Sequence, residues 1–233
     1  GGVLATVSAG GGLAALAITL WYLLSGTGQS RTGGRITVFG DNIVVDGMAL
    51  FFTVIVTSVV VLVALASYDY LDDHPHQAEY YSLTLLSATG MALVAAANSF
   101  AVAFISIELV SLPSYALVAS LKTNKGSVEG GLKYFLVGAL SSAILAYGIS
   151  LVYAATGSLG FEPVAEVIAD DGFDTGLLGF GLLLVLGGFA FKMAAVPFHF
   201  WAPEAYEGAP APISAFLSSA SKAAGFVITF RVF

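Results

Sequence analysis

Long apolar runs separated by shorter polar segments dominate the hydrophobic pattern of this chain. A transmembrane helix needs about 20 consecutive apolar residues, and seven runs come near that length. They are Val3–Leu24, Met48–Tyr68, Tyr80–Ala97, Phe100–Leu121, Gly130–Ala155, Leu177–Val196 and Ile213–Phe233. Strands of a transmembrane barrel would be short and would alternate apolar with polar positions, whereas these runs are continuous. The pattern predicts an all-α, polytopic transmembrane helical bundle of about seven spans.

Three polar segments between the runs have features of their own. Arg35–Val45 sets two β-favouring stretches around a Gly-Asp-Asn turn, which predicts a small hairpin in the loop at 35–45. The carboxylate-rich segment Phe161–Asp174 is expected to be a solvated loop. His74 and His76 lie in another acidic loop and could hold a metal, but a solvated turn explains them better. No metal site is predicted.

Composition agrees with a membrane location and narrows the chemistry. Hydrophobic residues make up 58% of the chain, charged residues 10%, and the mean hydropathy is +0.91. A soluble domain typically has about 45–50% apolar and about 25% charged residues. There are no cysteines, so thiolate-held iron–sulfur clusters, Cys-type zinc sites and disulfides are excluded from this chain. We expect contact with the lipid bilayer and no nucleic-acid partner.

Three charged residues lie deep inside the apolar runs: Glu108, Lys192 and Lys222. An ionised group at bilayer depth costs about 2.5–3.5 kcal/mol on insertion scales, so it needs a partner or a use. One acid and two amines in separate helices are typical of a proton path. A structural ion pair between helices is the alternative for Glu108, and a side chain extending to the membrane surface is the alternative for Lys192.

Prolines and glycines accompany two of these charges. Pro113 follows Glu108 by five residues and should kink the helix beside the acid. Gly187, Gly188 and Pro197 bracket Lys192, which predicts a broken helix around 187–201. Irregular backbone at membrane depth is tolerated where protein covers it or water reaches it, and transporters build ion sites there.

The remaining candidates have weaker signals. Lys133 follows Glu129 by four residues, a favourable spacing for an ion pair on one helix, so a local salt bridge and a relay role are both open. His199 lies near the predicted break and is a possible auxiliary group. If Glu108 and the three buried lysines were all ionised, positive charge would exceed negative charge in a medium of low dielectric constant. We therefore expect coupled protonation, as in proton-transfer sites.

Three blocks of sequence closely resemble subunit N of the proton-pumping NADH-quinone oxidoreductases (respiratory complex I). They are Glu108–Leu117 (ELVSLPSYAL), Gly131–Ala139 (GLKYFLVGA) and Phe191–Pro212 (FKMAAVPFHFWAPEAYEGAPAP). The resemblance runs in order from about residue 45 to 233. The related L- and M-type subunits and the multisubunit sodium/proton antiporters share these elements more loosely.

The resemblance implies an antiporter-like subunit of about fourteen helices, built from two inverted repeats of five. On that scheme the chain is a fragment with helices two to eight, in which 1–97 holds the leading helices, 98–233 holds the first repeat, and the second repeat is absent. Glu108 would modulate, Lys192 would load and release protons, and Lys222 would receive them.

The same resemblance implies partners and a location. NAD(H) or another donor, FMN, iron–sulfur clusters and quinone would be bound by partner subunits and no cofactor by this chain. M- and K-type membrane subunits would be its neighbours, in the plasma membrane of a prokaryote. A multisubunit sodium/proton antiporter and a purely structural membrane subunit are the alternatives.

Overall fold

The computed structural model describes residues 2–26, 35–71, 75–171 and 176–233. The predicted residues His74 and Asp174 lie outside this part. The elements are α1 (Gly2–Leu24), β1 (Ile36–Val38), β2 (Ile43–Val45), α2 (Gly47–Tyr70), α3 (Gln77–Ala96), α4 (Phe100–Val118), α5 (Lys125–Thr156), α6 (Phe161–Asp171), α7 (Leu177–Met193), α8 (Trp201–Gly208), α9 (Ala211–Phe216), a π-helical turn (Leu217–Ser221) and α10 (Lys222–Val232).

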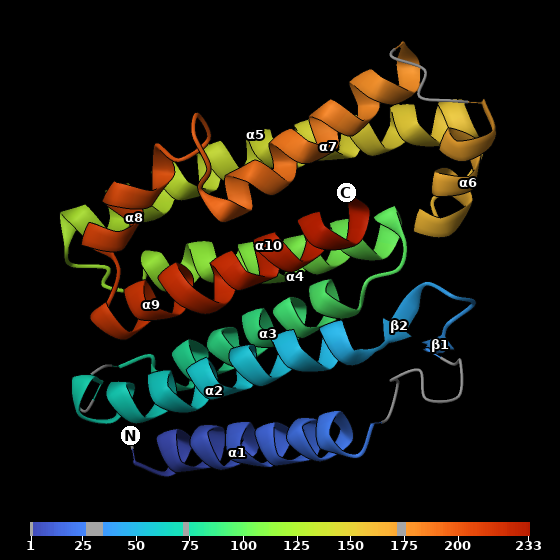
Figure 1. Ribbon diagram of the computed structural model, residues 1–233. Helices are drawn as coiled ribbons and strands as arrows, with labels where there is room; N and C mark the ends of the chain where they lie inside the picture. Colours follow the sequence, from blue (N-terminus) through green and yellow to red (C-terminus); the bar gives the residue numbers. More distant parts are fainter. Residues whose placement is uncertain (1, 27–34, 72–74, 172–175) are drawn as a thin grey trace.

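The long helices lie side by side in a slab, with α1 at one edge and the α5/α7 pair at the other (Figure 1). Five helices of the described part are long and apolar enough to cross a membrane: α1, α2, α4, α5 and the continuous α9–α10 segment. The 17 residues of α7 fall short of that length, and α3 is less apolar along its 20 residues. The molecule is therefore a polytopic α-helical membrane protein, and a count of seven spans stays a prediction.

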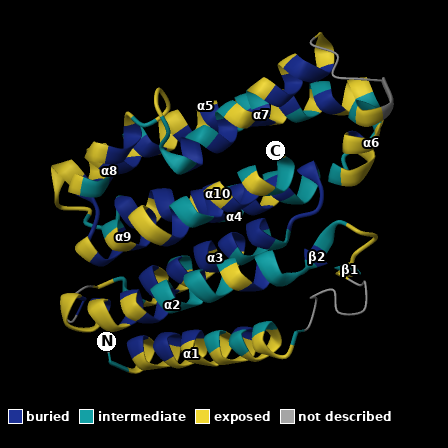
Figure 2. Cartoon of the chain, viewed as in Figure 1, coloured by how far each residue is buried: buried dark blue, intermediate teal, exposed yellow. Residues whose placement is uncertain are grey.

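Exposed side chains of the bundle are largely apolar, as a lipid environment requires. In Figure 2 exposed positions run along the outer faces of α1 and of the α5/α7 pair. Trp21 on α1 and Leu140 on α5 are 72% and 63% exposed, for example. Exposing such apolar faces to water would be unfavourable, so we assign them to contact with lipid.

A close approach of two glycines aligns α7 with α5. A Cβ on Gly148 would lie 2.8 Å from the carbonyl oxygen of Gly181, and a Cβ on Gly181 would lie 3.0 Å from that of Gly148. Small residues allow this backbone-to-backbone packing, which is common between membrane helices. The contact places the N-terminal half of α7 against the C-terminal half of α5.

The hairpin formed by β1 and β2 covers one end of the slab. Its strands are antiparallel, with Ile36 opposite Val45. The Asn98 side chain donates to the carbonyl of Asp41 in the turn at 2.7 Å. Arg35 pairs with Glu162 of α6 at 2.9 Å. These contacts join the hairpin to the start of α4 and to α6.

The acidic segment after α5 is helical over Phe161–Asp171, so the expectation of a loop there was wrong. Val164 and Ile168 lie one helical turn apart and form the apolar face, and Val164 is buried. Pro163 occupies the first turn, where a missing amide hydrogen costs no helical hydrogen bond. The density of carboxylates hid this short amphipathic pattern.

Candidate functional site

The backbone of α7 breaks immediately after Lys192. The helix ends at Met193, Ala194 adopts a left-handed conformation (φ 54°), and the Ala195 amide bonds back to the carbonyl of Ala190 at 2.9 Å. Residues 194–200 form turns before α8 begins at Trp201. The break is narrower than the predicted 187–201. In Figure 1 helical structure is interrupted beside α5, between the end of α7 and the start of α8, and α8 then continues in the same general direction.

Pro197 lies within the break, whereas Gly187 and Gly188 lie inside α7. Their role is packing. A Cβ on Gly188 would come within 2.7 Å of the Leu145 Cβ on α5, and one on Gly187 would meet the Phe198 ring at 3.6 Å. The two glycines therefore let α5 and the folded-back break approach α7, and they do not interrupt the helix.

Lys192 is a buried amine without a hydrogen bond. It is 3% exposed, and its Nζ finds no hydrogen-bond partner among the described residues. The Nζ lies over the Tyr134 ring, 6.0 Å from its centroid. Glu108 is close enough to act on Lys192 electrostatically. A buried cation with no salt bridge and no hydrogen bond is poorly stabilised, so the state of Glu108 matters to it.

Glu108 lies on α4 and points toward α5. Its carboxylate accepts a short hydrogen bond from the Ser142 hydroxyl, and the side chain is only partly buried. Ser142 stands in an apolar run beside Ser141 and escaped the sequence analysis. A pair of serines within a transmembrane run is the signal that could have revealed it.

The helix α4 continues through Pro113, which leaves the Leu109 carbonyl without its helical amide donor. Serine hydroxyls donate hydrogen bonds to the carbonyl of the next residue. The Val110 carbonyl accepts from Ser114 at 2.6 Å and from Ser87 of α3 at 3.0 Å. Polar atoms thus concentrate within two residues of Glu108.

Lys222 begins α10 directly after a π-helical turn, Leu217–Ser221. Its Nζ donates to the carbonyl of Met193 at 3.2 Å, the last residue of α7 and the neighbour of Lys192. Close packing supports this meeting, because a Cβ on Gly225 would lie 3.0 Å from the Met193 nitrogen. The Lys222 amine thereby contacts the backbone of the residue that follows Lys192. π-Helical turns are frequent at functional sites.

Lys133 lies between two carboxylates near the end of the bundle that carries α8. Its Nζ is 2.8 Å from Glu129 and 3.0 Å from Glu204. The side chain is 42% exposed and borders a polar hollow of about 330 Å³ with Glu207. The second partner, Glu204 on α8, was not foreseen because it is distant in sequence.

His199 lies in the break with its ring 4.7 Å from that of Phe200. Its Nδ1 is buried and has no hydrogen-bond partner in the described part of the chain. Within that part, no three His, Cys, Asp or Glu side chains come together in a metal-binding cluster.

Sequence analysis missed a partly buried ion pair at the opposite end of the bundle. The Arg231 guanidinium holds Asp46 through two hydrogen bonds of 2.6 and 3.1 Å and donates to the Ala95 carbonyl at 2.6 Å. Asp46 also accepts from the amide of Ala49 at the start of α2. One arginine thus ties the end of α10 to α2 and α3. Its position at the edge of an apolar run resembles an ordinary interfacial arginine, so no sequence signal separates the two.

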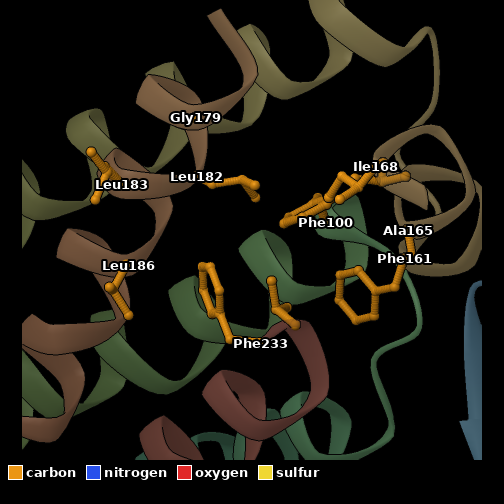
Figure 3. Close-up of a pocket in the computed structure, with 11 residues that line it drawn as sticks. Phe100, Phe161, Ala165, Ile168, Gly179, Leu182, Leu183, Leu186 and Phe233 are labelled. Carbon is orange, nitrogen blue, oxygen red and sulfur yellow. The ribbon is translucent and has the colours of Figure 1, made fainter. Parts of the chain in front are cut away.

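An apolar cavity of about 290 Å³ has no charged residue in its lining (Figure 3). Phe100, Phe161, Ile168, Leu182 and Phe233 line it together with other apolar residues and a glycine. It contains no group able to carry a proton. The break in α7 and its two lysines are therefore the better functional candidate.

Comparison with known proteins identifies the family of this chain. The family model described as "NADH:quinone oxidoreductase/Mrp antiporter, TM" matches residues 97–233. F(420)H(2) dehydrogenase subunit N of Methanosarcina mazei is 39% identical over 236 residues, covering 100% of this chain and 46% of that protein. NADH-quinone oxidoreductase subunit N of Desulforamulus reducens is 43% identical over 190 residues, covering 81% of this chain and 40% of that protein.

Solved structures give the same picture. A chain of respiratory complex I from Thermus thermophilus superposes with a TM-score of 0.80 at 31% identity, covering 97% of this chain and 48% of that one. A chain of the Mrp complex from Dietzia sp. DQ12-45-1b superposes with a TM-score of 0.81 at 22% identity, covering 99% and 43%, which shows a shared fold.

Fold and site together define a multi-pass membrane protein with the antiporter-like fold. The chain belongs to the NADH:quinone oxidoreductase/Mrp antiporter family. The resemblance to subunit N is confirmed, and the chain spans less than half the length of the curated relatives named above.

Proposed function

We propose that this chain is part of a non-redox membrane subunit of an NADH-quinone oxidoreductase-type complex, and that the subunit translocates protons coupled to electron transfer to quinone. The observation that carries the proposal is Lys192. It is an amine 3% exposed, has no hydrogen bond in the described structure, and lies beside a helix break with one acid acting on it from α4.

Three residues form the proposed relay. Glu108 stabilises the charged form of Lys192. When that interaction loosens, Lys192 releases its proton toward Lys222, which approaches the same helix end through the Met193 carbonyl. The imbalance of charge supports coupling, because two amines share one acid in a low-dielectric interior. Lys133 contributes little to the imbalance since Glu129 and Glu204 already contact it.

The proposal includes partners that this chain does not supply. We assign the electron donor, FMN, iron–sulfur clusters and quinone to other subunits. For clusters held by thiolates, the absence of cysteine from this chain supports the assignment. The donor class is NADH or another reduced carrier, since one relative is named for F(420)H(2) and another for NADH. Neighbouring M- and K-type membrane subunits and the plasma membrane of a prokaryote complete the setting.

Glu108→Ala tests the proposal in the intact complex. We expect proton translocation per electron to fall about tenfold, the factor that corresponds to a loss of about 1.4 kcal/mol in the rate-limiting transfer. The measurement is the rate of vesicle acidification divided by the rate of quinone reduction. Glu166→Ala removes an exposed carboxylate of α6 and should leave the ratio unchanged. A wild-type ratio for Glu108→Ala would make the acid merely structural.

Lys133→Met is expected to reduce the same ratio less than twofold. Lys133 is 42% exposed and contacts two carboxylates, and exposed ion pairs contribute little. The same acidification assay compares it with Glu108→Ala. A loss as large as that of Glu108→Ala would assign Lys133 to the relay.

A sodium/proton antiporter is the second candidate, favoured only by the shared fold. Sodium sites use several carboxylate and carbonyl oxygens, and Glu108 is the one carboxylate at depth in the described spans. Sodium-dependent proton movement in vesicles without an electron donor would favour this candidate over the redox-coupled one.

A further inference from the structure

The amine of Lys222 has an aromatic surrounding that differs from that of Lys192. Its Nζ lies 5.8 Å from the ring centroid of Trp201 and 5.6 Å from that of Tyr206. The Met193 carbonyl accepts its hydrogen bond at 3.2 Å. In the described part of the chain, no carboxylate lies within salt-bridge distance of this amine. Its cationic form is thus met by two rings and one carbonyl.

The rings that face Lys222 are held by other contacts. Trp201 is 1% exposed, donates its Nε1 hydrogen to the Phe191 carbonyl at 3.1 Å, and stacks on Tyr134 with centroids 4.2 Å apart. Tyr206 meets Trp201 edge-on at 5.9 Å. Contacts with α7 and α5 therefore hold the Trp201 ring in place independently of Lys222.

Two physical effects favour an ammonium at this point. The faces of Trp and Tyr rings carry negative electrostatic potential, which attracts a cation most strongly when water is excluded. The end of α7 presents carbonyl groups without helical donors, and a positive charge there is favoured by the helix dipole. Lys192, by comparison, has one ring at 6.0 Å and no carbonyl partner.

We infer that Trp201, Tyr206 and the Met193 carbonyl form an aromatic cage for the Lys222 ammonium, and that the two rings are positioning residues that hold Lys222 against the broken end of α7. The inference rests on the proposed function only for its consequence, proton transfer. The cage itself is a statement about geometry and can be tested alone.

Site-resolved amine labelling tests the cage in the full-length protein. The measured quantity is the rate at which an amine-acylating reagent modifies Lys222, followed by mass spectrometry, with exposed Lys133 as the internal reference. Tyr206→Leu removes one ring and should raise the rate about fivefold, as expected for the loss of one shielded cation–π contact. Tyr206→Phe keeps a ring face and should label at nearly the wild-type rate. Tyr147→Leu, at a tyrosine of α5 that is 57% exposed, should have no effect.

The possible results separate the cage from the proposed function. Unchanged labelling in Tyr206→Leu and in Trp201→Leu would overturn the cage, whatever the transport activity. Faster labelling together with a lower proton-to-electron ratio, restored in Tyr206→Phe, would support both. Faster labelling with a wild-type ratio would keep the cage and show that proton transfer does not depend on it. A variant in which the buried Lys192 also labels faster than the Lys133 reference has unfolded. Tyr206→Phe and Trp201→Phe, which both keep a ring, then decide. The cage predicts faster labelling of Lys222 in Trp201→Phe than in Tyr206→Phe, because an indole binds a cation more strongly than a phenyl ring does, and equal labelling would overturn it.

Discussion

Lys192→Met is expected to abolish proton translocation without destabilising the protein. Methionine matches the length and much of the volume of lysine but carries no exchangeable proton. The amine it replaces is 3% exposed and has no hydrogen bond in the described structure. Since a charged lysine at bilayer depth costs about 2.5–3.5 kcal/mol, the variant should be at least as stable as the wild type. The measurement is vesicle acidification per electron, beside thermal unfolding of the purified complex.

Two further variants make this prediction specific. Lys192→Arg keeps the charge but cannot release its proton in practice, so we expect translocation to be lost here too, with lower stability. Lys125→Met removes an exposed lysine at the start of α5 and should behave as the wild type. Normal translocation by Lys192→Met would show that the buried amine serves only to set helix register.

Arg231→Leu is expected to cost about 1.5–3 kcal/mol of stability, the range for hydrogen bonds to charged groups. The Arg231 side chain is 8% exposed and that of Asp46 is 25% exposed. The substitution leaves the Asp46 carboxylate without its bidentate partner and the Ala95 carbonyl without its donor. The free energy of unfolding in detergent, from a denaturant titration, measures the loss.

A double-mutant cycle identifies the source of that cost. If an uncompensated carboxylate is responsible, Arg231→Leu combined with Asp46→Asn should recover part of the stability. Asparagine also keeps a side-chain oxygen for the amide of Ala49 at the start of α2. Arg35→Leu breaks an exposed pair with Glu162 and should cost at most about 1 kcal/mol. If Arg231→Leu and Arg35→Leu lowered the free energy of unfolding by the same small amount, Arg231 would not stabilise the packing of α10 against α2 and α3.

Local pattern was enough to predict the helical segments. The predicted run Val3–Leu24 became α1, Gly2–Leu24, and Met48–Tyr68 became α2, Gly47–Tyr70. A continuous apolar run of that length can satisfy its backbone in lipid only as a helix, so no distant contact is needed to decide it. Mixed segments were harder. The helix α6 was missed because its stability depends on the packing of Val164 and Ile168 against the bundle.

The candidate site also has one part that the sequence predicts and one part that depends on tertiary packing. Composition and motif predicted that Glu108, Lys192 and Lys222 are charges at membrane depth, because each lies well inside an apolar run. The partner of each charge came from another helix. Ser142 reaches Glu108 over 34 positions of sequence, Glu204 reaches Lys133 over 71, and Asp46 reaches Arg231 over 185.

Helix identity, membrane location and the presence of charged residues inside apolar runs were therefore determined by the sequence itself. How far each charge is buried was not: Lys192 is 3% exposed, whereas Lys133 is 42% exposed. Only the tertiary structure decided which carbonyl, ring or carboxylate meets each charge. The physical reason is that hydrogen bonds and cation–π contacts act over a few ångströms. Such distances between helices are set by packing contacts such as Gly148 against Gly181, which no single run of sequence contains.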